Sequence, residues 1–569
     1  MLFGSFAASW SAPLDFLFTS WSGEMFKSEN FRDHFLTPIA IGLALSTAAL
    51  FMLERRARLL GQPFTKKTVK WACIALTVLG FFTYFDFLNP NVRYNNYYHR
   101  HEFFHYYMGS KYFEQIGYAR LYECTAIAEV ELGFGDKLKK QDMRDLRVNL
   151  IGPISNTYVF SDPAQCKSHF EPEKWEAFKT DVKWFEQSAR GTYWDNMKKD
   201  HGYNPPPVWT MSGKFFGSFA PAGDGYFKIL SLIDVFLHIG VLAMLGWAFG
   251  LRTMAVGSVF WGCNAVANFY WTGGAFMRQD WIFFLISSVC LARKRHFGLS
   301  GAALMWSALL RVFPAVCFFG GGLIVLFHLI KKRRFHPDHL RWVAGAAIAL
   351  GVLGGASLMV SGVGAYKEFA HHISTHRNTP LTNHMGLESI LSHNWDGRML
   401  FSQDDRLDDP FSQWKQGRID RIHNLKWVQR GIILLIAGWI AWALRRSKLL
   451  WVGVPLSVPL LVSLMNLTCY YYVVFLAAVV LVRQRPALAV GLLATSGASQ
   501  VLHYRFYFID DKFVAHSYLF YVAALLILIG YSRPFSIARL KAWLAGKPEP
   551  KPKPLPPGPT DAPKVSAAE

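Results

Sequence analysis

Residues 342–361 read WVAGAAIALGVLGGASLMVS, twenty residues without one charged side chain. A helix of about 20 apolar residues is long enough to cross the hydrocarbon core of a bilayer. Comparable apolar stretches recur along the whole chain. They predict an all-α polytopic membrane protein with about 13 transmembrane helices, at 35–53, 71–88, 227–250, 253–272, 277–292, 297–315, 316–330, 342–361, 428–444, 449–465, 467–482, 487–503 and 516–532.

The composition agrees with this fold class. Of the 569 residues, 52% are hydrophobic and 17% are charged, whereas soluble proteins carry about 25% charged residues. This mixture argues against an ordinary soluble enzyme and against a disordered chain. The net charge is +21, from 60 Lys and Arg against 39 Asp and Glu. Such a surplus is typical of nucleic-acid binding or of positively charged cytoplasmic loops.

The positions of the basic residues decide between these two interpretations. Basic clusters follow every second boundary between expected spans, so they all fall on one side of the membrane, which is the positive-inside pattern. This predicts a periplasmic N-terminus and a cytoplasmic C-terminus, and no nucleic-acid partner. The clusters are Arg55, Arg56, Arg58, Lys66, Lys67 and Lys70; Arg293, Lys294 and Arg295; Lys331, Lys332, Arg333, Arg334 and Arg341; Arg445, Arg446 and Lys448; Arg483 and Arg485; and Arg533, Arg539 and Lys541.

The same topology divides the chain into segments. Two long stretches fall on the periplasmic side, and the first of them contains helical patterns. The Pro/Lys-rich end of the chain predicts disorder from about residue 547. The expected segments are an interfacial N-terminus (1–34), two transmembrane helices (35–88), a large helical first periplasmic loop (89–226), transmembrane helices (227–361), a second periplasmic loop (362–427), transmembrane helices (428–532) and a cytoplasmic tail (533–569).

The densest polar and aromatic stretch is FDFLNPNVRYNNYYHRHEFFHYYMGSKYFEQIGYARLYEC, residues 85–124, at the start of the large loop. His101, Glu102 and His105 in it form a literal H-E-x-x-H. On a helix this spacing places two zinc ligands on one face, with the glutamate as general base of a hydrolase. No third ligand follows at a familiar offset, so zinc hydrolysis is the less favoured interpretation.

The favoured interpretation rests on a resemblance. The run EFFHYY at 102–107, continued by GSKYF at 109–113 and GYARLY at 117–122, is similar to the start of the first outer loop in the GT-C superfamily of membrane glycosyltransferases. The segments RQDWIFF (278–284) and LLRVFPAV (309–316) resemble elements of bacterial polyprenyl-phosphate mannosyltransferase-like members. The resemblance covers 71–330 well and the rest by topology. The family's usual acid at this place is Asp, whereas here it is Glu102.

The resemblance implies an inverting hexosyl- or pentosyltransferase of a bacterial inner membrane. It would transfer a sugar from a polyprenyl-phosphate donor to a periplasmic acceptor, which is a lipid, a glycan or a protein. Such a reaction needs a carboxylate to take the acceptor proton and cations to hold the leaving phosphate. Four ionisable residues reach a similar depth on the outer side, where intramembrane charge indicates function: Glu102, Arg278, Asp280 and Arg311.

Each candidate residue is expected to have one role. Glu102 is the expected catalytic base and Asp86 its rival. Arg278 and Arg311 are expected to bind the donor phosphate, with Asp280 orienting one of them and Arg505 as a further phosphate candidate. The residues expected to line the substrate are His101, His105, Tyr106 and Tyr107. No cofactor is required with certainty. A divalent cation remains possible, for which the second loop offers Asp404, Asp405, Asp408 and Asp409.

Cys124 and Cys166 are the only two cysteines in the first periplasmic loop. An oxidising compartment permits a disulfide between them, and two separate buried thiols are the alternative. The other five cysteines fall in expected spans, where they act as small apolar residues.

Two other functional classes remain open. A transporter or flippase of a lipid-linked or anionic substrate also uses charges inside spans, but it predicts topologically related halves, and no internal repeat is evident. A non-catalytic membrane scaffold needs no charges at a common depth.

Overall fold

The computed structural model describes residues 31–89, 97–189, 191–407 and 409–532. These residues form an almost entirely helical protein, as expected. Their strands make two small antiparallel sheets, β1 (Asp142–Asp145) with β2 (Leu150–Pro153) and β3 (His384–Met385) with β4 (Leu467–Thr468). Nearly all of the expected interfacial segment 1–34 and the whole of the tail 533–569 lie outside the described residues.

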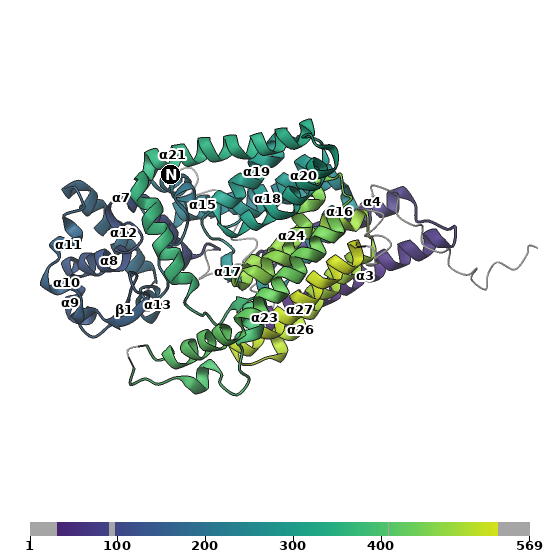
Figure 1. Ribbon diagram of the computed structural model, residues 1–569. Helices are drawn as coiled ribbons and strands as arrows, with labels where there is room; N and C mark the ends of the chain where they lie inside the picture. The colour runs from purple at the N-terminus through teal and green to yellow at the C-terminus, as the bar shows by residue number, and fades with distance from the viewer. Residues whose placement is uncertain (1–30, 90–96, 190, 408, 533–569) are drawn as a thin grey trace, which may run out of the picture.

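The larger part of the molecule is a bundle of long apolar helices, which occupies the centre and right of Figure 1. Most of the expected spans correspond to one helix each. The helices are α3 (Thr37–Leu59), α4 (Lys66–Tyr84), α15 (Asp224–Phe249), α16 (Leu251–Gly262), α17 (Phe269–Thr272), α18 (Asp280–Arg293), α19 (Phe297–Leu310), α20 (Phe318–Lys332), α21 (Pro337–Arg377), α22 (Leu387–Ser392), α23 (Ser412–Leu444), α24 (Gly453–Leu464), α25 (Leu476–Val479), α26 (Ala487–Arg505) and α27 (Ile509–Tyr531).

The expected number of 13 spans is not confirmed. Within the described ranges, six helical segments are long and apolar enough to cross a membrane, and three further apolar ones are shorter. Part of the difference is that some expected spans do not continue as one long helix. In the expected span 297–315, for example, α19 ends at Leu310, because the backbone is extended at Arg311 (φ −148°, ψ 133°).

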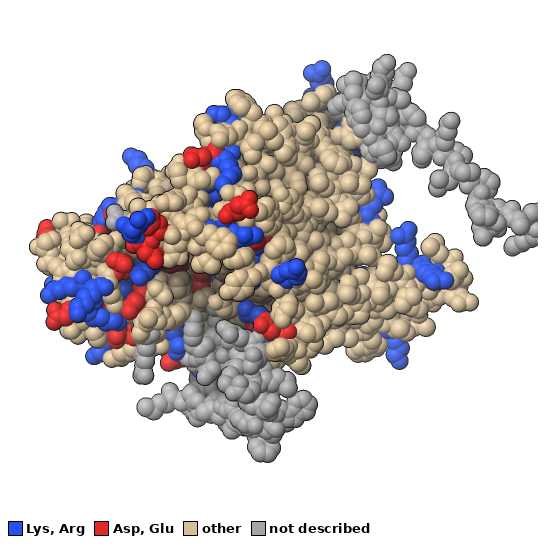
Figure 2. Space-filling view, turned by 90° about the horizontal axis from the view of Figure 1, so that it is seen from below, with Lys and Arg blue, Asp and Glu red and all other residues tan. Residues whose placement is uncertain are grey.

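The outer faces of the bundle are apolar. In the most hydropathic windows of α21 and α23, only 17% of the residues are buried inside the protein, and Met359, Leu434 and Leu435 are among the most exposed large side chains. Figure 2 shows a wide band of this face almost without charge, Asp and Glu gathered towards one end, and only Lys and Arg at the opposite end. Such faces are those of a multi-pass membrane protein.

Glycines bring several of these helices into close contact. An added Cβ on Gly301 would collide with the backbone of Trp342, and one on Gly345 would collide with the backbone of Gly298, so α19 and α21 touch through their main chains. Close approach at small residues is the usual way in which helices pack when lipid surrounds them.

The rest of the molecule is a compact unit, called here the loop domain, which comprises 97–189 and 191–217 and lies at the left of Figure 1. Its helix α12 (Pro172–Ala189) buries Trp175, Phe178, Val182 and Phe185, the apolar face of an amphipathic helix. The other helices are α5 (Arg100–Phe103), α6 (Gly109–Lys111), α7 (Phe113–Ile116), α8 (Leu121–Glu129), α9 (Gly135–Leu138), α10 (Tyr158–Ser161), α11 (Ala164–Lys167), α13 (Thr192–Met197) and α14 (Pro207–Gly217).

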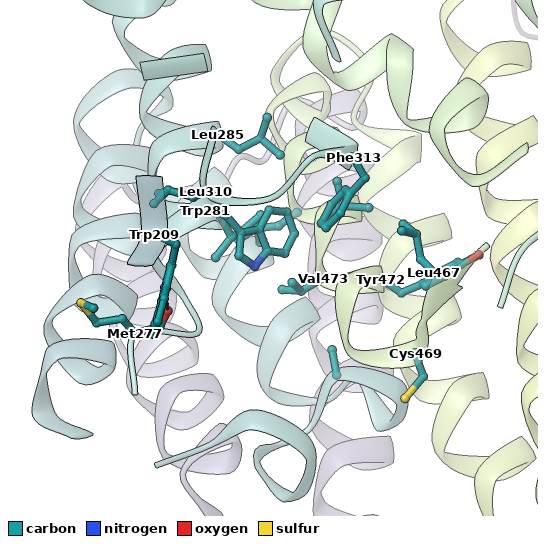
Figure 3. Close-up of a cluster of buried hydrophobic side chains, with 14 of the residues drawn as sticks. Trp209, Met277, Trp281, Leu285, Leu310, Phe313, Leu467, Cys469, Tyr472 and Val473 are labelled. Atoms are coloured by element: carbon teal, nitrogen blue, oxygen red, sulfur yellow. Dashed lines mark hydrogen bonds between the residues drawn. The ribbon is translucent and has the colours of Figure 1, made fainter. Parts of the chain in front are cut away.

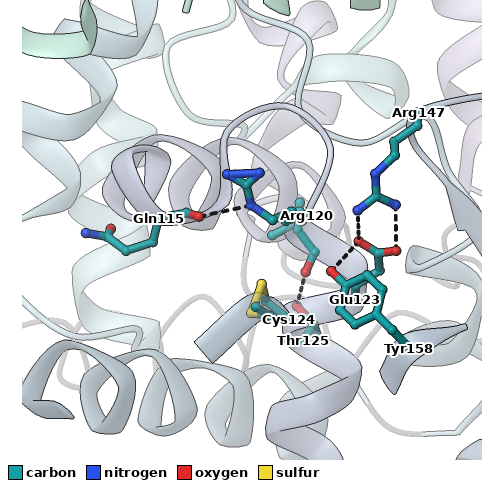
Figure 4. The surroundings of a disulfide bond; sticks show 9 residues. Gln115, Arg120, Glu123, Cys124, Thr125, Arg147 and Tyr158 are labelled. Atoms are coloured by element: carbon teal, nitrogen blue, oxygen red, sulfur yellow. Dashed lines mark hydrogen bonds and ion pairs between the residues drawn. A yellow bond between two sulfur atoms is a disulfide. The ribbon is translucent and has the colours of Figure 1, made fainter. Parts of the chain in front are cut away.

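The disulfide expected from the two loop cysteines is present. Cys124 on α8 is bonded to Cys166 on α11, with the two Cα atoms 5.6 Å apart. Beside it, the guanidinium of Arg147 donates two hydrogen bonds of 2.7 Å to the carboxylate of Glu123, which also accepts one from Tyr158 (Figure 4). Covalent and ionic links together fix the loop domain around α8.

One helix connects the two parts of the molecule. The 41 residues of α21 would extend about 60 Å, roughly twice the hydrocarbon thickness of a bilayer. The helix packs on α19 in the bundle and breaks at Gly362 (φ 76°, ψ 165°). Beyond the break, the ring of His372 stacks on Tyr118 of the loop domain at 5.5 Å. The expected second loop, 362–427, is thus helical at both ends, in α21 and α23.

Candidate functional site

The H-E-x-x-H stretch lies on one short helical rod that begins with α5, continues through a π-helical turn at Phe104–Met108 and ends with α6. Residues four apart share a face on such a rod. Glu102 and Tyr106 face Arg278, and His101 lies beside His105, with ring centroids 4.6 Å apart. The motif is therefore divided between two adjoining faces.

Arg278 is the centre of the first face. Its Nε lies 3.1 Å from Oε2 of Glu102, and the two side chains are 3% and 15% exposed. Its Nη1 donates a hydrogen bond to the Tyr106 hydroxyl. The guanidinium also lies over the rings of Tyr106 (4.4 Å) and Tyr470 (5.2 Å). A carboxylate and two aromatic rings compensate the buried charge.

Asp234 holds the backbone on which Arg278 lies. Its Oδ2 accepts the Arg278 N–H at 2.9 Å and its Oδ1 accepts the Gln279 N–H at 3.0 Å. Asp234 comes from α15, inside an expected span, and it is buried. Asp234 is not among the site residues expected from the sequence, although an acid within the apolar run LSLIDVFLHIG is a signal for a functional or structural site.

Arg311 lies at the end of α19 and also near Tyr106. Its guanidinium is 5.9 Å from the Tyr106 ring and 5.8 Å from the Trp209 ring. Nη1 donates to the carbonyl of Leu310 at 2.6 Å, and the charge interacts with the carboxylate of Asp280. The side chain is 6% exposed, yet Nη2 has no hydrogen-bond partner within the described part of the chain.

Closely packed aromatic residues lie near the two arginines. The rings of Trp281 and Phe313 lie 4.8 Å apart, each a few residues from one of the arginines in sequence. Trp209 of the loop domain donates its indole N–H to the carbonyl of Met277 at 3.1 Å. Figure 3 shows Trp209, Trp281 and Phe313 in one cluster of buried apolar side chains. The charged residues of the cluster therefore lie on closely packed apolar side chains.

The four ionisable residues that the sequence places at one depth thus meet in one cluster, together with Tyr106. This set is called here the Arg278 cluster: Glu102, Tyr106, Arg278, Asp280 and Arg311. Their roles in catalysis stay predictions.

Three other candidates are placed elsewhere. Asp86 is buried at the end of α4, next to Tyr97. Tyr107 points into the loop domain, where its hydroxyl donates to the carbonyl of Ala220 at 2.7 Å, because it lies one helical position beyond Tyr106. Arg505 is exposed at the end of α26 and contributes no contact to the Arg278 cluster as far as the chain is described.

His101 and His105 face Asp200, which lies almost a hundred residues further along the chain. His101 Nε2 is 3.6 Å from Asp200 Oδ2. One ligand atom from each of the three residues lies within 4.8 Å of the others. Across the described ranges, this is the one group of three or more side chains with the geometry for a metal ion.

The acidic run in the second expected loop does not form such a group. Asp404 pairs with Arg406 at 2.8 Å, and Asp409 pairs with Lys415 at 2.5 Å. Asp408 lies outside the described residues. Asp405 accepts a hydrogen bond of 2.7 Å from the side-chain amide of Gln403. The described carboxylates of the run therefore contact side chains close to them in sequence rather than one another.

An apolar cavity of about 500 Å³ lies beside the Arg278 cluster, between α4 and α15. Aromatic side chains from α4 and its end line one wall, including Phe81, Tyr84 and Phe85. Asp234 and Gln279 line the wall nearest to Arg278. A second, more polar pocket of about 320 Å³ includes Arg377, His384, Glu388, Arg418 and Asn466 among its lining residues.

Comparison with protein-family models, with curated proteins and with solved structures finds no match to this chain. The functional interpretation therefore rests on the geometry described above and on the resemblance in sequence.

Proposed function

We propose that the chain is a membrane-embedded glycosyltransferase of the GT-C type, which transfers a sugar from a polyprenyl-phosphate donor to an acceptor at the outer face of a bacterial inner membrane. The observation that carries the proposal is the Arg278 cluster. It combines two carboxylates, Glu102 and Asp280, with two buried arginines, of which Arg311 keeps a hydrogen-bond donor unused.

The arginines suit the leaving group. A polyprenyl phosphate leaves as a phosphate monoester with up to two negative charges, and guanidinium groups stabilise such charge most strongly where water is excluded. The guanidinium groups of Arg278 and Arg311 both lie near the Tyr106 ring, at 4.4 and 5.9 Å from its centre. A phosphate between them would receive donors from both, including the unused Nη2 of Arg311.

Glu102 suits the role of base. In the proposed step its carboxylate takes the proton of an acceptor hydroxyl as the oxygen of that hydroxyl bonds to the anomeric carbon. The bond from that carbon to the phosphate oxygen breaks, and the phosphate keeps the electron pair. Phosphate binding would draw Arg278 away from Glu102, which leaves the carboxylate free to accept the proton.

The neighbouring cavity suits the lipid part of the donor. Its walls are mainly aromatic and aliphatic, and it reaches the backbone of Gln279, one residue from Arg278. A volume of about 500 Å³ accommodates the first isoprene units of a lipid chain when its phosphate lies at the arginines.

The test uses the full chain in proteoliposomes with a panel of radiolabelled polyprenyl-phosphate hexoses and pentoses. Glu102→Gln is expected to lower turnover by 10²- to 10⁴-fold while donor binding persists. Arg311→Gln is expected to weaken donor binding, and Arg430→Gln, an exposed arginine on α23, serves as the matched control. Turnover of Glu102→Gln at the wild-type rate would contradict the assignment. Movement of the donor across the bilayer with its sugar–phosphate bond intact would favour a flippase instead.

A further inference from the structure

The second face of the H-E-x-x-H rod forms a site of its own. We propose that His101, His105 and Asp200 bind a divalent transition-metal ion of the Zn²⁺ class. The proposal does not depend on the transferase function, because metal binding can be measured without any substrate.

The spacing of the ligands fits such an ion. In a tetrahedral zinc site with bonds of about 2.0–2.1 Å, neighbouring ligand atoms lie about 3.3 Å apart. His101 Nε2 and Asp200 Oδ2 are separated by 3.6 Å, and all three ligand atoms lie within 4.8 Å of one another. Small side-chain rotations therefore suffice to close the site.

The hydrogen bonds of His105 fit a ligand as well. A metal-binding histidine usually donates its second ring N–H to a backbone carbonyl or a carboxylate, which fixes the tautomer. The Nδ1 of His105 lies 2.7 Å from the carbonyl oxygen of His101, so its N–H can donate there. Nε2 lies 2.7 Å from the Tyr122 hydroxyl and 3.1 Å from the carbonyl oxygen of Met197. As a metal ligand, it would direct its lone pair to the ion in place of these two contacts.

The donor set selects the class of ion. Two imidazole nitrogens and one carboxylate favour zinc and similar transition metals over Mg²⁺ or Ca²⁺, which prefer oxygen ligands. Three protein ligands also leave a fourth coordination position open. The side chains of His101 and Asp200 are 25% and 44% exposed, so an ion can reach them from solvent.

The site differs from that of the zinc hydrolase considered from the sequence. In such a hydrolase, the glutamate of the motif serves the metal-bound water. Here the Glu102 carboxylate lies 3.1 Å from Arg278, on the adjoining face. The third ligand is also new, because Asp200 follows the motif by almost a hundred residues and no sequence offset indicates it.

The test measures zinc binding by the purified full chain after chelator treatment, in competition with a chromophoric chelator. We expect about one tightly bound ion per chain. We also expect at least tenfold weaker binding in His105→Gln and in Asp200→Asn, and no change in His169→Gln, which alters an exposed histidine of the same domain. Equal zinc affinity of the wild type and Asp200→Asn would overturn the proposal. It would also be overturned if His169→Gln lost as much zinc affinity as His105→Gln and Asp200→Asn.

A further variant separates loss of a ligand from loss of the fold. Asp200→His exchanges the carboxylate for another zinc ligand, so it should restore binding, and Co²⁺ bound in place of Zn²⁺ should show an altered visible spectrum. Resistance of the loop domain to protease reports folding in every variant. A folded Asp200→His protein that binds no better than Asp200→Asn would contradict Asp200 as a ligand.

Discussion

Lys198 in the loop domain and Arg311 in the bundle are both almost fully buried, but their surroundings differ. Lys198 Nζ lies 2.5 Å from Glu129 Oε2, and Trp194 donates to the other carboxylate oxygen at 2.7 Å, so both oxygens of Glu129 are engaged. Arg311 interacts with Asp280 but leaves one amino group without a hydrogen bond. Burial of a hydrogen-bond donor without a partner is unfavourable, so such a group indicates a ligand-binding role. A buried ion pair whose hydrogen bonds are all made indicates a structural role.

The largest expected effect on stability tests the structural side of this comparison. Lys198→Met leaves the Glu129 carboxylate buried without its cation, which costs about 3–5 kcal/mol. Thermal unfolding of the detergent-solubilised chain, followed by protease cleavage within the loop domain, measures the loss. The double variant Lys198→Met, Glu129→Leu should recover most of it. A Lys198→Met protein as stable as the wild type would show that the pair of Lys198 and Glu129 does not stabilise the fold.

A smaller change in stability, in the stabilising direction, is expected from a substitution in the Arg278 cluster. The double variant Arg311→Met, Asp280→Asn removes an incompletely satisfied pair, and such replacements are often neutral or stabilising by about 1–4 kcal/mol. We expect a melting temperature equal to or above that of the wild type. The rise in melting temperature on adding a polyprenyl-phosphate sugar should disappear. A strongly destabilised variant would show that the pair holds the fold.

The smallest expected effect on stability concerns Glu131, a solvent-accessible carboxylate of the loop domain. Burial works to raise the pKa of Glu131, but hydrogen bonds from Lys167 and Trp175 lower it below its usual value. Because the pKa is lower in the folded state, the stabilisation is present above about pH 4.3 and disappears as the pH falls through the folded pKa.

Glu131→Gln should therefore reduce the stability of the loop domain at pH 7 by less than about 1 kcal/mol. The difference from the wild type should shrink as the pH falls below about 4.3. The same protease-coupled melting measures it, and a difference that grows on acidification would reverse the sign of this assignment.

Much of the architecture was predictable because lipid imposes simple rules. Uncharged runs such as 342–361 predicted the helices. Charged residues inside or beside such runs predicted members of the Arg278 cluster, among them Arg278 and Arg311. The length of α21 was not predictable, because its last residues, including Glu368 and His372, are polar and still helical. Hydropathy marks where apolar sequence ends, not where the helix ends.

The direction of individual side chains was harder to predict. Tyr106 and Tyr107 are adjacent tyrosines that the sequence does not distinguish. Tyr106 lies against Arg278, whereas Tyr107 packs in the loop domain. The π-helical turn that carries them changes the register of the faces. Asp200 could not be found, because only folding of the loop domain brings it to His101. Asp234 was visible as an acid in an apolar run but was not recognised.

Two backbone torsion angles, φ and ψ of Gly362, set the direction in which α21 continues beyond its break. On one side of Gly362 the helix belongs to the bundle, and on the other it holds the loop domain, where His372 Nε2 lies 2.6 Å from the side-chain oxygen of Asn204. Residues with a side chain rarely adopt a φ of 76°. The course of α21 from the bundle to the loop domain therefore depends on this one glycine, and a larger residue at position 362 would strain the backbone between the two parts.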